Sequence, residues 1–325
     1  MSKITKILKF LPPEVAHHVA LSSLNLIYKL GLTTLFFKKP KNEKLSFLNL
    51  KFKNKLGIAA GLDKNGDYFN ALGSLGFGFI EIGTVTPLPQ PGNSRPRIFR
   101  FFSEGAIVNR LGFNNKGLQH MIKNLEKRKY DGVLGINIGA NKNSEGNKRV
   151  NDYIDCFCAL HKYADYITIN ISSPNTPNLR DFHNKDNLEF LLQSINEEKL
   201  KLGYKKPIFL KISPDEDNES ILDVITLVKK YNFDALIATN TTTDKSLLKN
   251  NPDLDGGLSG KPLFKKSNEL IKYIKSIDPE INIVGVGGIF NKDDFQEKIQ
   301  AGAALAQIYT SFIIDGPSVI NKILD

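Results

Sequence analysis

The sequence Tyr166-Ile167-Thr168-Ile169-Asn170-Ile171-Ser172-Ser173-Pro174-Asn175 joins an apolar, β-branched run to a dense group of polar side chains. Residues 166–169 predict a buried strand. Pro174 has no N–H for a ladder bond, so the strand has to end before it. Two amides and two hydroxyls fixed at a strand end suit a ligand site, although a Ser/Asn/Pro turn explains this stretch equally well when it is taken alone.

Seven other apolar runs repeat this pattern, and each leads through a polar or glycine-rich break into a stretch with helical periodicity. Runs rich in Val, Ile and Leu that alternate with helices indicate parallel strands buried on both faces. Eight of them within about 260 residues favour an α/β fold of the closed (β/α)₈ TIM-barrel type. A doubly wound sheet is the alternative, but no G-x-G-x-x-G sequence opens its first βα unit. The predicted strands span residues 56–62, 77–85, 132–140, 163–172, 206–214, 233–241, 281–289 and 304–312, and residues 45–53 predict a hairpin that plugs one end.

The composition is that of a globular protein, with 325 residues, 41% hydrophobic and 24% charged side chains, and a formal net charge of +10. A diffuse positive field could favour anionic lipid, nucleic acid or an anionic substrate, although a solvated lysine-rich surface accounts for most of it. With Cys156 and Cys158 as the two cysteines, no disulfide framework is expected, which fits a reducing compartment. Both fall in a predicted helix, and we interpret them as packing residues.

Residues 1–40 differ from the rest and predict an amino-terminal segment distinct from the barrel domain of residues 41–325. Apolar residues from Ile4 to Leu11 share one helical face, Pro12-Pro13 breaks it, and a second helix ends near Gly31. The uncharged stretch 15–28 is too short to span a bilayer, and no signal peptide is recognised. Two amphipathic basic helices followed by Phe36-Phe37 fit a segment lying in a membrane interface. A helical hairpin packed on the barrel and a transit peptide are the alternatives.

The carboxyl ends of the predicted strands carry polar or glycine residues, and in such a barrel these ends meet around one mouth. No end offers a cluster of His, Cys or carboxylate residues, so we predict no metal site. A hydrolytic triad is missing as well. Amides, hydroxyls and lysines instead suit a bound cofactor that supplies the reactivity. The strand-end residues are Lys64, Thr84, Asn137, Asn170, Ser173, Lys211, Thr239, Asn240, Gly287, Gly288, Tyr309 and Thr310.

Two features of this set point to an anionic cofactor. Residues 285–289, Gly-Val-Gly-Gly-Ile, could cradle a phosphate with bare backbone N–H groups, although a G-x-G-G run is as often a turn. Residues 256–260 and Tyr309-Thr310 would add donors. Lys211 lies inside an apolar strand and needs an anionic partner, which a reduced flavin or a carboxylate side chain could provide.

The asparagines near the predicted mouth point to the substrate. Amides such as Asn109, Asn175 and Asn240 complement the ring N–H and C=O groups of a pyrimidine. Lys64 could pair with a substrate carboxylate, or with Asp63. Ser173 would then be a general base or proton relay, which requires a water chain or a basic neighbour because serine is a poor base.

These residues resemble the class 2, quinone-linked dihydroorotate dehydrogenases. The resemblance covers about residues 45–315, and the amino-terminal helices, which also have a counterpart, are its least motif-like part. The motifs that carry it are Ala59-Ala60-Gly61-Leu62-Asp63-Lys64, Ile80-Glu81-Ile82-Gly83-Thr84-Val85-Thr86-Pro87, Pro89-Gln90-Pro91-Gly92-Asn93, Asn109-Arg110-Leu111-Gly112-Phe113-Asn114-Asn115, Gly135-Ile136-Asn137-Ile138-Gly139, Ala238-Thr239-Asn240-Thr241-Thr242, and residues 170–175, 256–260 and 285–289.

The resemblance implies two sets of binding residues, with Ser173 matching the family's catalytic base. Thr310 stands where relatives carry serine, and the hydroxyl is kept. The set implied for FMN is Ala60, Gly61, Leu62, Asp63, Lys64, Thr84, Asn137, Asn170, Lys211, Thr239, Gly260, Gly288, Tyr309 and Thr310. The set implied for dihydroorotate is Lys64, Asn109, Arg110, Leu111, Gly112, Phe113, Asn170, Asn175, Asn240 and Thr241.

The resemblance also implies oxidation of (S)-dihydroorotate to orotate in pyrimidine biosynthesis. Ser173 would remove the C5 proton, a hydride would pass from C6 to FMN, and a membrane quinone entering between the amino-terminal helices would reoxidise the flavin. We further expect a monomer without a nucleic-acid partner, attached peripherally to the cytoplasmic face of a bacterial cell membrane, because no transit-like leader is recognised.

The sequence also allows three rival interpretations. An FMN barrel acting on RNA uracil, similar to the tRNA-dihydrouridine synthases, suits the +10 charge but uses a cysteine as proton donor. A class 1 dihydroorotate dehydrogenase would carry cysteine in place of Ser173. No cysteine stands at a predicted strand end. A basic, non-enzymatic scaffold leaves the eight polar strand ends unexplained.

Overall fold

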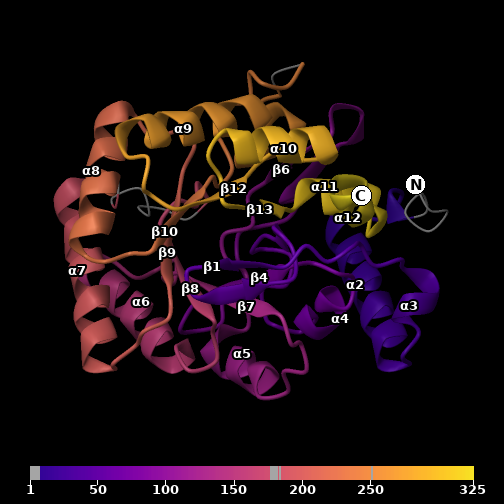
Figure 1. Ribbon diagram of the computed structural model, residues 1–325, viewed down its shortest axis with the longest axis horizontal. Helices are drawn as coiled ribbons and strands as arrows, with labels where there is room; N and C mark the ends of the chain where they lie inside the picture. Colours follow the sequence, from indigo (N-terminus) through magenta and orange to yellow (C-terminus); the bar gives the residue numbers. More distant parts are fainter. Residues whose placement is uncertain (1–7, 176–181, 183, 250–251) are drawn as a thin grey trace.

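The computed structural model describes residues 8–175, 182, 184–249 and 252–325, and its centre is a closed barrel of parallel strands surrounded by helices (Figure 1). Neighbouring strands follow the chain order, and β13 pairs with β3 to close the ring. The prediction of a TIM barrel is therefore confirmed. The barrel strands are Leu56–Ile58 (β3), Phe79–Val85 (β4), Val133–Ile138 (β7), Tyr166–Asn170 (β8), Ile208–Ile212 (β9), Ala235–Ala238 (β10), Ile283–Val286 (β12) and Leu305–Ile308 (β13).

A helix follows each barrel strand and covers the outside of the ring (Figure 1). Several of these helices begin at an Asn or Asp whose side chain accepts a hydrogen bond from the first turn, as Asn291 does from the Asp294 N–H at 2.9 Å. The outer helices are Phe69–Gly73 (α4), Gly117–Leu125 (α5), Gly146–Leu160 (α6), Lys185–Lys201 (α7), Asn218–Lys230 (α8), Phe264–Ile277 (α9), Lys292–Gln300 (α10), Thr310–Asp315 (α11) and Ser318–Leu324 (α12), with short 3₁₀ helices at Phe102–Glu104 (η1) and Lys261–Leu263 (η3).

Each predicted run contains an observed strand, but the strands are shorter than predicted. The run 163–172, for example, contains β8 at Tyr166–Asn170. Its first residues close the end of α6, where the Tyr163 N–H bonds the Leu160 carbonyl at 3.0 Å, and its last residues form a loop at the mouth. All residues of β8 are buried, as expected for strands covered on both faces.

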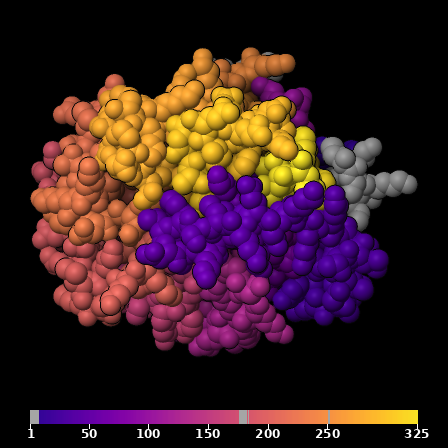
Figure 2. Space-filling model, viewed as in Figure 1, coloured from indigo at the N-terminus to yellow at the C-terminus, as the bar shows by residue number. Residues whose placement is uncertain are grey.

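The amino end of the barrel is closed by aromatic rings and by the predicted hairpin. Strands β1 (Leu45–Phe47) and β2 (Leu50–Phe52) pair antiparallel, and Phe52 meets the buried ring of Phe79 edge-on at 5.4 Å. Inside the barrel the ring of Tyr166 stacks on that of Phe209 at 4.4 Å. In Figure 2 the violet segment that carries this hairpin lies across the front of the molecule. The predicted plug is therefore confirmed, and this end is filled with side chains.

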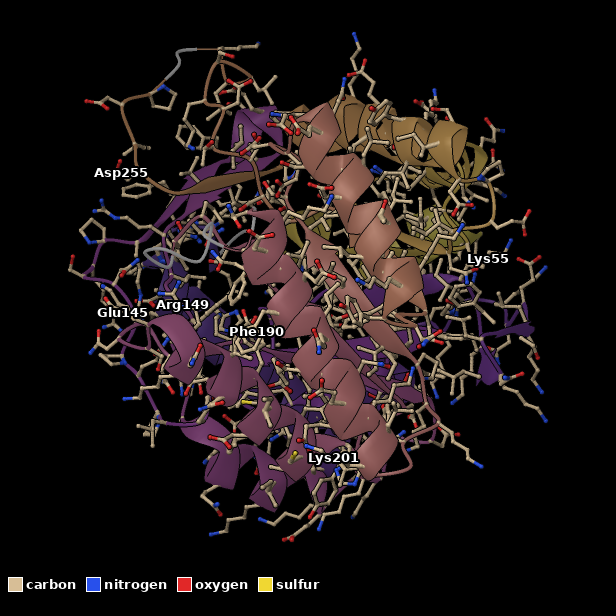
Figure 3. All side chains as sticks on the ribbon, turned by 90° about the vertical axis from the view of Figure 1, so that its left-hand side faces the viewer. Lys55, Glu145, Arg149, Phe190, Lys201 and Asp255 are labelled. Carbon is tan, nitrogen blue, oxygen red and sulfur yellow. The ribbon has the colours of Figure 1, made fainter. Side chains whose placement is uncertain are left out.

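A three-stranded sheet that the sequence patterns did not predict lies at the other end. Strand β6 (Ala106–Asn109) pairs antiparallel with β5 (Ile98–Phe101) and with β11 (Gly257–Gly260). The glycine-rich residues 256–260 are thus largely a strand rather than a loop. Figure 3 shows Asp255, just before β11, and Lys55, just before β3, on opposite sides of the molecule. This sheet therefore forms part of the mouth of the barrel.

The amino-terminal segment forms helices α2 (Pro13–Lys29) and α3 (Thr33–Phe36), and the helix expected before Pro12 lies mostly in residues 1–7, outside the described residues. Helix α2 begins with proline, as predicted, and packs against α4 and β5. Arg97 joins it to the mouth through two contacts with the Glu14 carboxylate, at 2.8 Å from Nε and 2.7 Å from Nη2. No helix within the described residues is long and apolar enough to cross a membrane. The boundary at residue 40 remains a prediction.

Candidate active site

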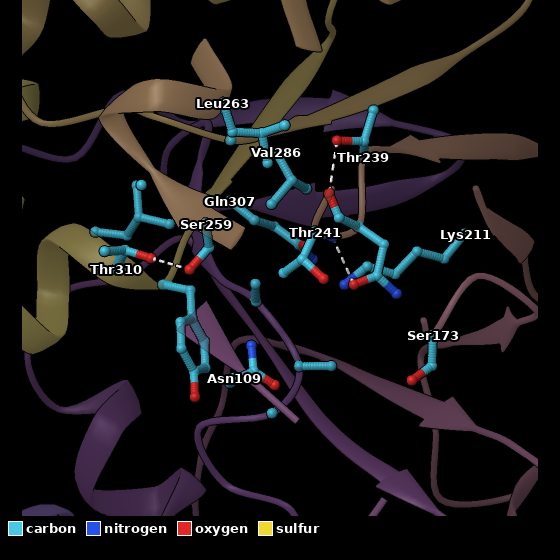
Figure 4. A pocket seen from close by; sticks show the side chains of 18 of the residues that line it. Asn109, Ser173, Lys211, Thr239, Thr241, Ser259, Leu263, Val286, Gln307 and Thr310 are labelled. Carbon is cyan, nitrogen blue, oxygen red and sulfur yellow. Dashed lines mark hydrogen bonds between the residues drawn. The ribbon is translucent and has the colours of Figure 1, made fainter. Parts of the chain in front are cut away.

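The carboxyl ends of the barrel strands surround a cavity (Figure 4). In the view of Figure 4, Ser173 and Lys211 lie to the right, and the hydrogen bond between Thr310 and Ser259 lies to the left. The cavity therefore has two chemically different ends. Both Ser173 and Lys211 line the same mouth, as a common site requires.

Most of the side chains selected from the sequence line this cavity. Leu62, Asp63, Arg110 and Asn137 do not line it: Leu62 is buried in the core, and Arg110 donates to the Pro96 carbonyl at 3.0 and 3.1 Å. The lining members of the two predicted sets, together with the predicted base, are Ala60, Gly61, Lys64, Thr84, Asn109, Leu111, Gly112, Phe113, Asn170, Ser173, Asn175, Lys211, Thr239, Asn240, Thr241, Gly260, Gly288, Tyr309 and Thr310.

Asn137 lies one layer beneath the cavity and fixes two residues that reach it. Its Oδ1 accepts hydrogen bonds from Thr84 Oγ1 at 2.6 Å and from Asn170 Nδ2 at 3.1 Å. Its Nδ2 donates to the buried carboxylate of Glu81 at 2.8 Å. Because each of these groups is buried, the network holds the amide of Asn170 in a fixed orientation at the mouth.

The two adjacent serines of the opening motif have different surroundings. Ser172 Oγ donates to Asn170 Oδ1 at 3.2 Å and accepts from Asn240 Nδ2 at 3.0 Å, so it is part of the framework. Ser173 Oγ lines the cavity, and the hydrogen bond that the described residues give it comes from the Asn175 N–H at 3.3 Å. The side chain of Ser173 is buried and directed to the ligand space, which separates it from Ser172.

Lys64 lies on the loop after β3, and its Nζ donates to the Gly61 carbonyl at 2.6 Å. Burial, assisted by the positive charge of Arg97, lowers the pKa of Lys64 to about 8. The alternative pairing with Asp63 is wrong, because the Asp63 carboxylate accepts from the backbone N–H groups of Asp67 and Tyr68 at 2.9 and 2.7 Å. Lys64 is therefore available to an anion in the cavity.

Lys211 is buried in β9 beside Asn170 of β8, with which it is in register. Burial lowers its pKa, and the carboxylate of Glu81 acts in the opposite direction. No carboxylate of the described residues forms a salt bridge with Lys211. A carboxylate partner for this lysine, the alternative to a flavin, is therefore present only as the longer-range electrostatic interaction with Glu81. An anionic ligand at the mouth would compensate the buried ammonium group.

The opposite end of the cavity consists of backbone and hydroxyl groups. Thr310 Oγ1 donates to Ser259 Oγ at 2.8 Å. Gly288 has φ +77°, and a Cβ placed on it would lie 2.4 Å from the Cβ of Phe264, so only glycine fits without displacing α9. Bare N–H groups and hydroxyls suit a phosphate, whereas the amides and lysines of the other end suit a polar ring, and together they fit a flavin mononucleotide.

Sequence reasoning missed several residues that the cavity contains. Gln307 lines the cavity and donates through Nε2 to Glu81 at 2.8 Å, and its signal was a polar residue within an apolar strand, as for Lys211. Apolar wall residues such as Leu263 and Val286 carry no such signal. His17 of α2 was missed too. Burial, together with the charge of Lys64, lowers the pKa of His17 to about 3.

The chemistry of this arrangement excludes some reactions and favours others. No group of three or more His, Cys, Asp or Glu side chains that could hold a metal occurs within the described residues. Cys156 is buried in α6 and Cys158 is on the same helix, and neither lines the cavity. A set of fixed amides, one hydroxyl that lines the cavity and two lysines can orient a small polar anion and accept a proton from it.

Comparisons with known proteins agree with this geometry. A family model described as dihydroorotate dehydrogenase matches residues 43–325. A protein of Marinobacter nauticus named dihydroorotate dehydrogenase (quinone) is 48% identical over 322 residues, which is 97% of this chain and 95% of that relative. A relative of the same name from Neisseria meningitidis is 47% identical over 326 residues, covering 98% of this chain and 97% of the relative.

Solved structures give the same result. The crystal structure of DHODH from Eimeria tenella in complex with ferulenol has a TM-score of 0.89 at 31% identity and covers 100% of this chain and 94% of that chain. The ligand-free form of the Eimeria tenella protein has a TM-score of 0.87 at 33% identity, with coverages of 94% and 92%. The similarity over nearly the whole chain confirms the resemblance seen in the sequence motifs, and the chain belongs to the dihydroorotate dehydrogenase family.

Proposed function

We propose that this protein is a flavin-dependent enzyme that oxidises dihydroorotate to orotate and passes the electrons to a membrane quinone. The observation that carries the proposal is a single cavity in which Lys64, Ser173 and Lys211 meet beside fixed asparagine amides, with a glycine and hydroxyl cradle at its other end. Relatives of nearly full length that are named dihydroorotate dehydrogenase (quinone) support it.

FMN is the flavin that we propose for the cavity. The cradle around Gly288 and Thr310 would hold its phosphate, and Lys211 with Asn170 and Thr84 would contact its ring system. Asn137 would act from beneath through Thr84 and Asn170. Leu62 and Asp63 would support the loop that carries Gly61 and Lys64. When bound, FMN supplies the acceptor for the hydride that leaves C6 of the substrate and passes electrons on to the quinone.

Dihydroorotate would bind between the amides and Lys64. The ammonium group of Lys64 would pair with the substrate carboxylate, which compensates the burial of both charges. Asn109, Asn175 and Asn240 each offer one acceptor and two donors to the N–H and C=O groups of the ring. Asn175 Nδ2 contacts Asn109 Oδ1 at 3.4 Å, so two of these amides already face each other across the mouth.

Ser173 would take the proton from C5 of the substrate. Its Oγ accepts the Asn175 N–H, and the residue lines the cavity. No His or carboxylate of the described residues contacts this hydroxyl, so its own proton has to leave through water. Ser173 would therefore act as a base through water at the mouth, and not through a catalytic dyad with a second side chain.

The amino-terminal helices would form the quinone side and the membrane contact. Helix α2 reaches the site through the Arg97–Glu14 contacts and through His17 beside Lys64. Its other side exposes large apolar side chains, which would lie in the interface of the cytoplasmic leaflet of a bacterial cell membrane. A monomer without a nucleic-acid partner remains our expectation. The cysteine-dependent RNA-modifying alternative is not favoured, because neither cysteine lines the cavity.

The visible spectrum of the purified full-length protein tests the proposal. We expect flavin absorption that bleaches when dihydroorotate is added under anaerobic conditions and returns when a quinone is added. A colourless protein that takes up no FMN, or a flavin that dihydroorotate does not bleach, would contradict the proposal. Bleaching by a dihydrouridine-containing RNA but not by dihydroorotate would favour the alternative enzyme.

A truncation separates the two half-reactions. Removing residues 1–40 should leave reduction of the flavin by dihydroorotate intact and abolish turnover with a long-chain quinone. Normal turnover of the truncated protein with long-chain quinones would assign α2 and α3 a purely structural role.

A further inference from the structure

Lys298 on α10 is a fully buried lysine outside the described site. Its relative exposure is 0%, and it is the one buried residue of α10, every residue of which is described. No carboxylate among the described residues forms a salt bridge with it, and burial lowers its pKa to about 7, so an anion bound in the cradle would favour its charged form. Burying an ammonium group without a contacting anion is costly, so its position calls for a physical reason.

The hydrogen bonds of Lys298 lead directly to the glycine cradle. Its Nζ donates to Ser267 Oγ at 2.9 Å, and Ser267 Oγ donates to the Val286 carbonyl at 2.7 Å. That carbonyl belongs to the peptide whose N–H is on Gly287, and Gly287 and Gly288 line the cavity. A chain of donors that ends on a carbonyl polarises the amide and strengthens its N–H as a donor.

The side chain of Lys298 also packs directly against the glycine cradle. Gly285 lies against the stem of Lys298, since a Cβ on Gly285 would be 2.7 Å from the lysine Cγ. The Nζ also lies 5.0 Å from the centre of the Phe264 ring, and Phe264 is the residue that forces Gly288 to be glycine. Lys298, Ser267 and Phe264 therefore form the rear wall of residues 285–288.

We propose that Lys298 is a positioning residue for the cofactor phosphate: it supplies a buried positive charge behind residues 285–288 and acts on the phosphate through Ser267 and the 286–287 peptide. The proposal rests on the proposed function, because it takes FMN as the ligand. Lys298 does not line the cavity and does not touch the phosphate; it makes the site select a flavin that carries phosphate over one that does not.

Binding of FMN and riboflavin to the full-length protein tests the proposal. The flavin is removed by dialysis, and each flavin is titrated back while its fluorescence is followed. In Lys298→Met, which keeps the stem and removes the charge, we expect FMN to bind about tenfold more weakly or worse, with riboflavin affinity changed less than about twofold. Lys272→Met on the exposed side of α9 makes the same change in net charge and should alter neither affinity.

Ser267→Ala gives a second, smaller perturbation if the methionine variant does not fold. It removes the link to the Val286 carbonyl and should weaken FMN about threefold without changing riboflavin. Equal losses for both flavins, or no loss for FMN in any folded variant, would overturn the role of Lys298. Unmodified protein that binds riboflavin as tightly as FMN would overturn it as well, whereas protein that binds neither flavin would overturn the proposed function itself.

Discussion

The barrel mouth and the amino-terminal helices depart from an ordinary globular protein in opposite ways. The mouth buries polar groups, with Asn170, Ser173 and Lys211 each exposing 6% or less of their surface. The helices expose apolar groups: eight of the fourteen exposed large hydrophobic side chains in the described part of the chain lie between Phe10 and Phe36. Each departure is costly in water, and under the proposed function each would be offset by a partner of matching chemistry, a polar anion at the mouth and an apolar phase at the helices.

The largest effect should come from breaking the mouth at its reacting group. We expect Ser173→Ala to retain FMN but to reduce the rate of flavin reduction by dihydroorotate by about 10²-fold or more, because a positioned general base is lost. The measurement is stopped-flow bleaching of the flavin under anaerobic conditions. Ser194→Ala on the exposed face of α7 makes the same chemical change away from the cavity and should leave the rate unchanged. A near-normal rate in Ser173→Ala would remove the serine from the mechanism.

The second prediction breaks the amino-terminal surface. Leu26, Leu30 and Leu35 are 59%, 62% and 75% exposed, so replacing all three with serine removes apolar area without unpacking the barrel. Binding to anionic vesicles should weaken by about tenfold or more, since each leucine that enters the interface contributes roughly 1–2 kcal/mol. Cosedimentation with vesicles of phosphatidylglycerol and phosphatidylethanolamine measures it.

A matched control distinguishes binding by this surface from non-specific hydrophobic binding to vesicles. Leu200, Leu202 and Leu222 are also exposed, at 71%, 40% and 47%, and lie on or beside α7 and α8. Their replacement with serine should not change vesicle binding. If both triple variants bound vesicles like the unmodified protein, the exposed face of α2 and α3 would not be the membrane contact.

The same contrast explains what could be predicted from the sequence. The barrel was predictable because each strand is an apolar run buried on both faces, and the mouth because polar residues such as Asn170 follow those runs directly. The place of β11 in the β5–β6–β11 sheet was not predictable, because two of the four residues of β11 are glycine. Strand β11 is held by pairing across 148 residues, Gly257 with Asn109, which local patterns do not contain.

The sequence also could not show which polar side chains line the cavity and which support it from beneath. Asn137 was selected as a ligand residue, but its side chain lies one layer down and holds Thr84 and Asn170. Gln307 was not selected, although it lines the cavity. The side-chain alternation of a strand shows which residues face inward, but not how far along the barrel axis each one lies. Only the register of the strands decides whether an inward residue reaches the ligand or its support.

The third prediction tests the contact between helix α2 and the barrel mouth at His17. Burial lowers the pKa of His17 to about 3, below its ordinary value of 6.5, so the folded state binds fewer protons than the unfolded state between these values. Its contribution to stability is complete above pH 6.5 and is lost as the pH falls toward 3. The melting temperature of the unmodified protein should therefore drop more than that of His17→Gln between pH 7 and pH 5, by on the order of 5 °C.

The neighbouring histidine tests one cause of this pH effect. His18 is exposed on the same turn of α2 and contributes to the lowered pKa of His17, so His18→Gln should reduce the extra pH dependence without abolishing it. Parallel melting curves for the unmodified protein and His17→Gln over this range would show that α2 does not hold His17 in its neutral form.

The smallest effect should come from the filled end of the barrel, where structure and ligand binding separate. Tyr166 stacks on Phe209, and its hydroxyl donates to Glu81 Oε2 at 2.9 Å. Tyr166→Phe keeps the ring and leaves Glu81 its bonds from Asn137 and Gln307, both at 2.8 Å, so the loss should be roughly 1–2 kcal/mol, or about 2–4 °C in melting temperature. FMN affinity should not change.

A second buried tyrosine shows whether this loss of stability comes from the lost hydrogen bond to Glu81. The hydroxyl of Tyr204 has no hydrogen-bond partner within the described residues, so Tyr204→Phe removes an oxygen of the same kind without removing a bond. It should leave the melting temperature unchanged or slightly higher. Equal losses in the two variants would mean that the Tyr166 hydroxyl contributes only by filling space. A weaker FMN affinity in Tyr166→Phe would mean that Glu81 transmits its environment to Lys211, and the two ends of the barrel would then not be independent.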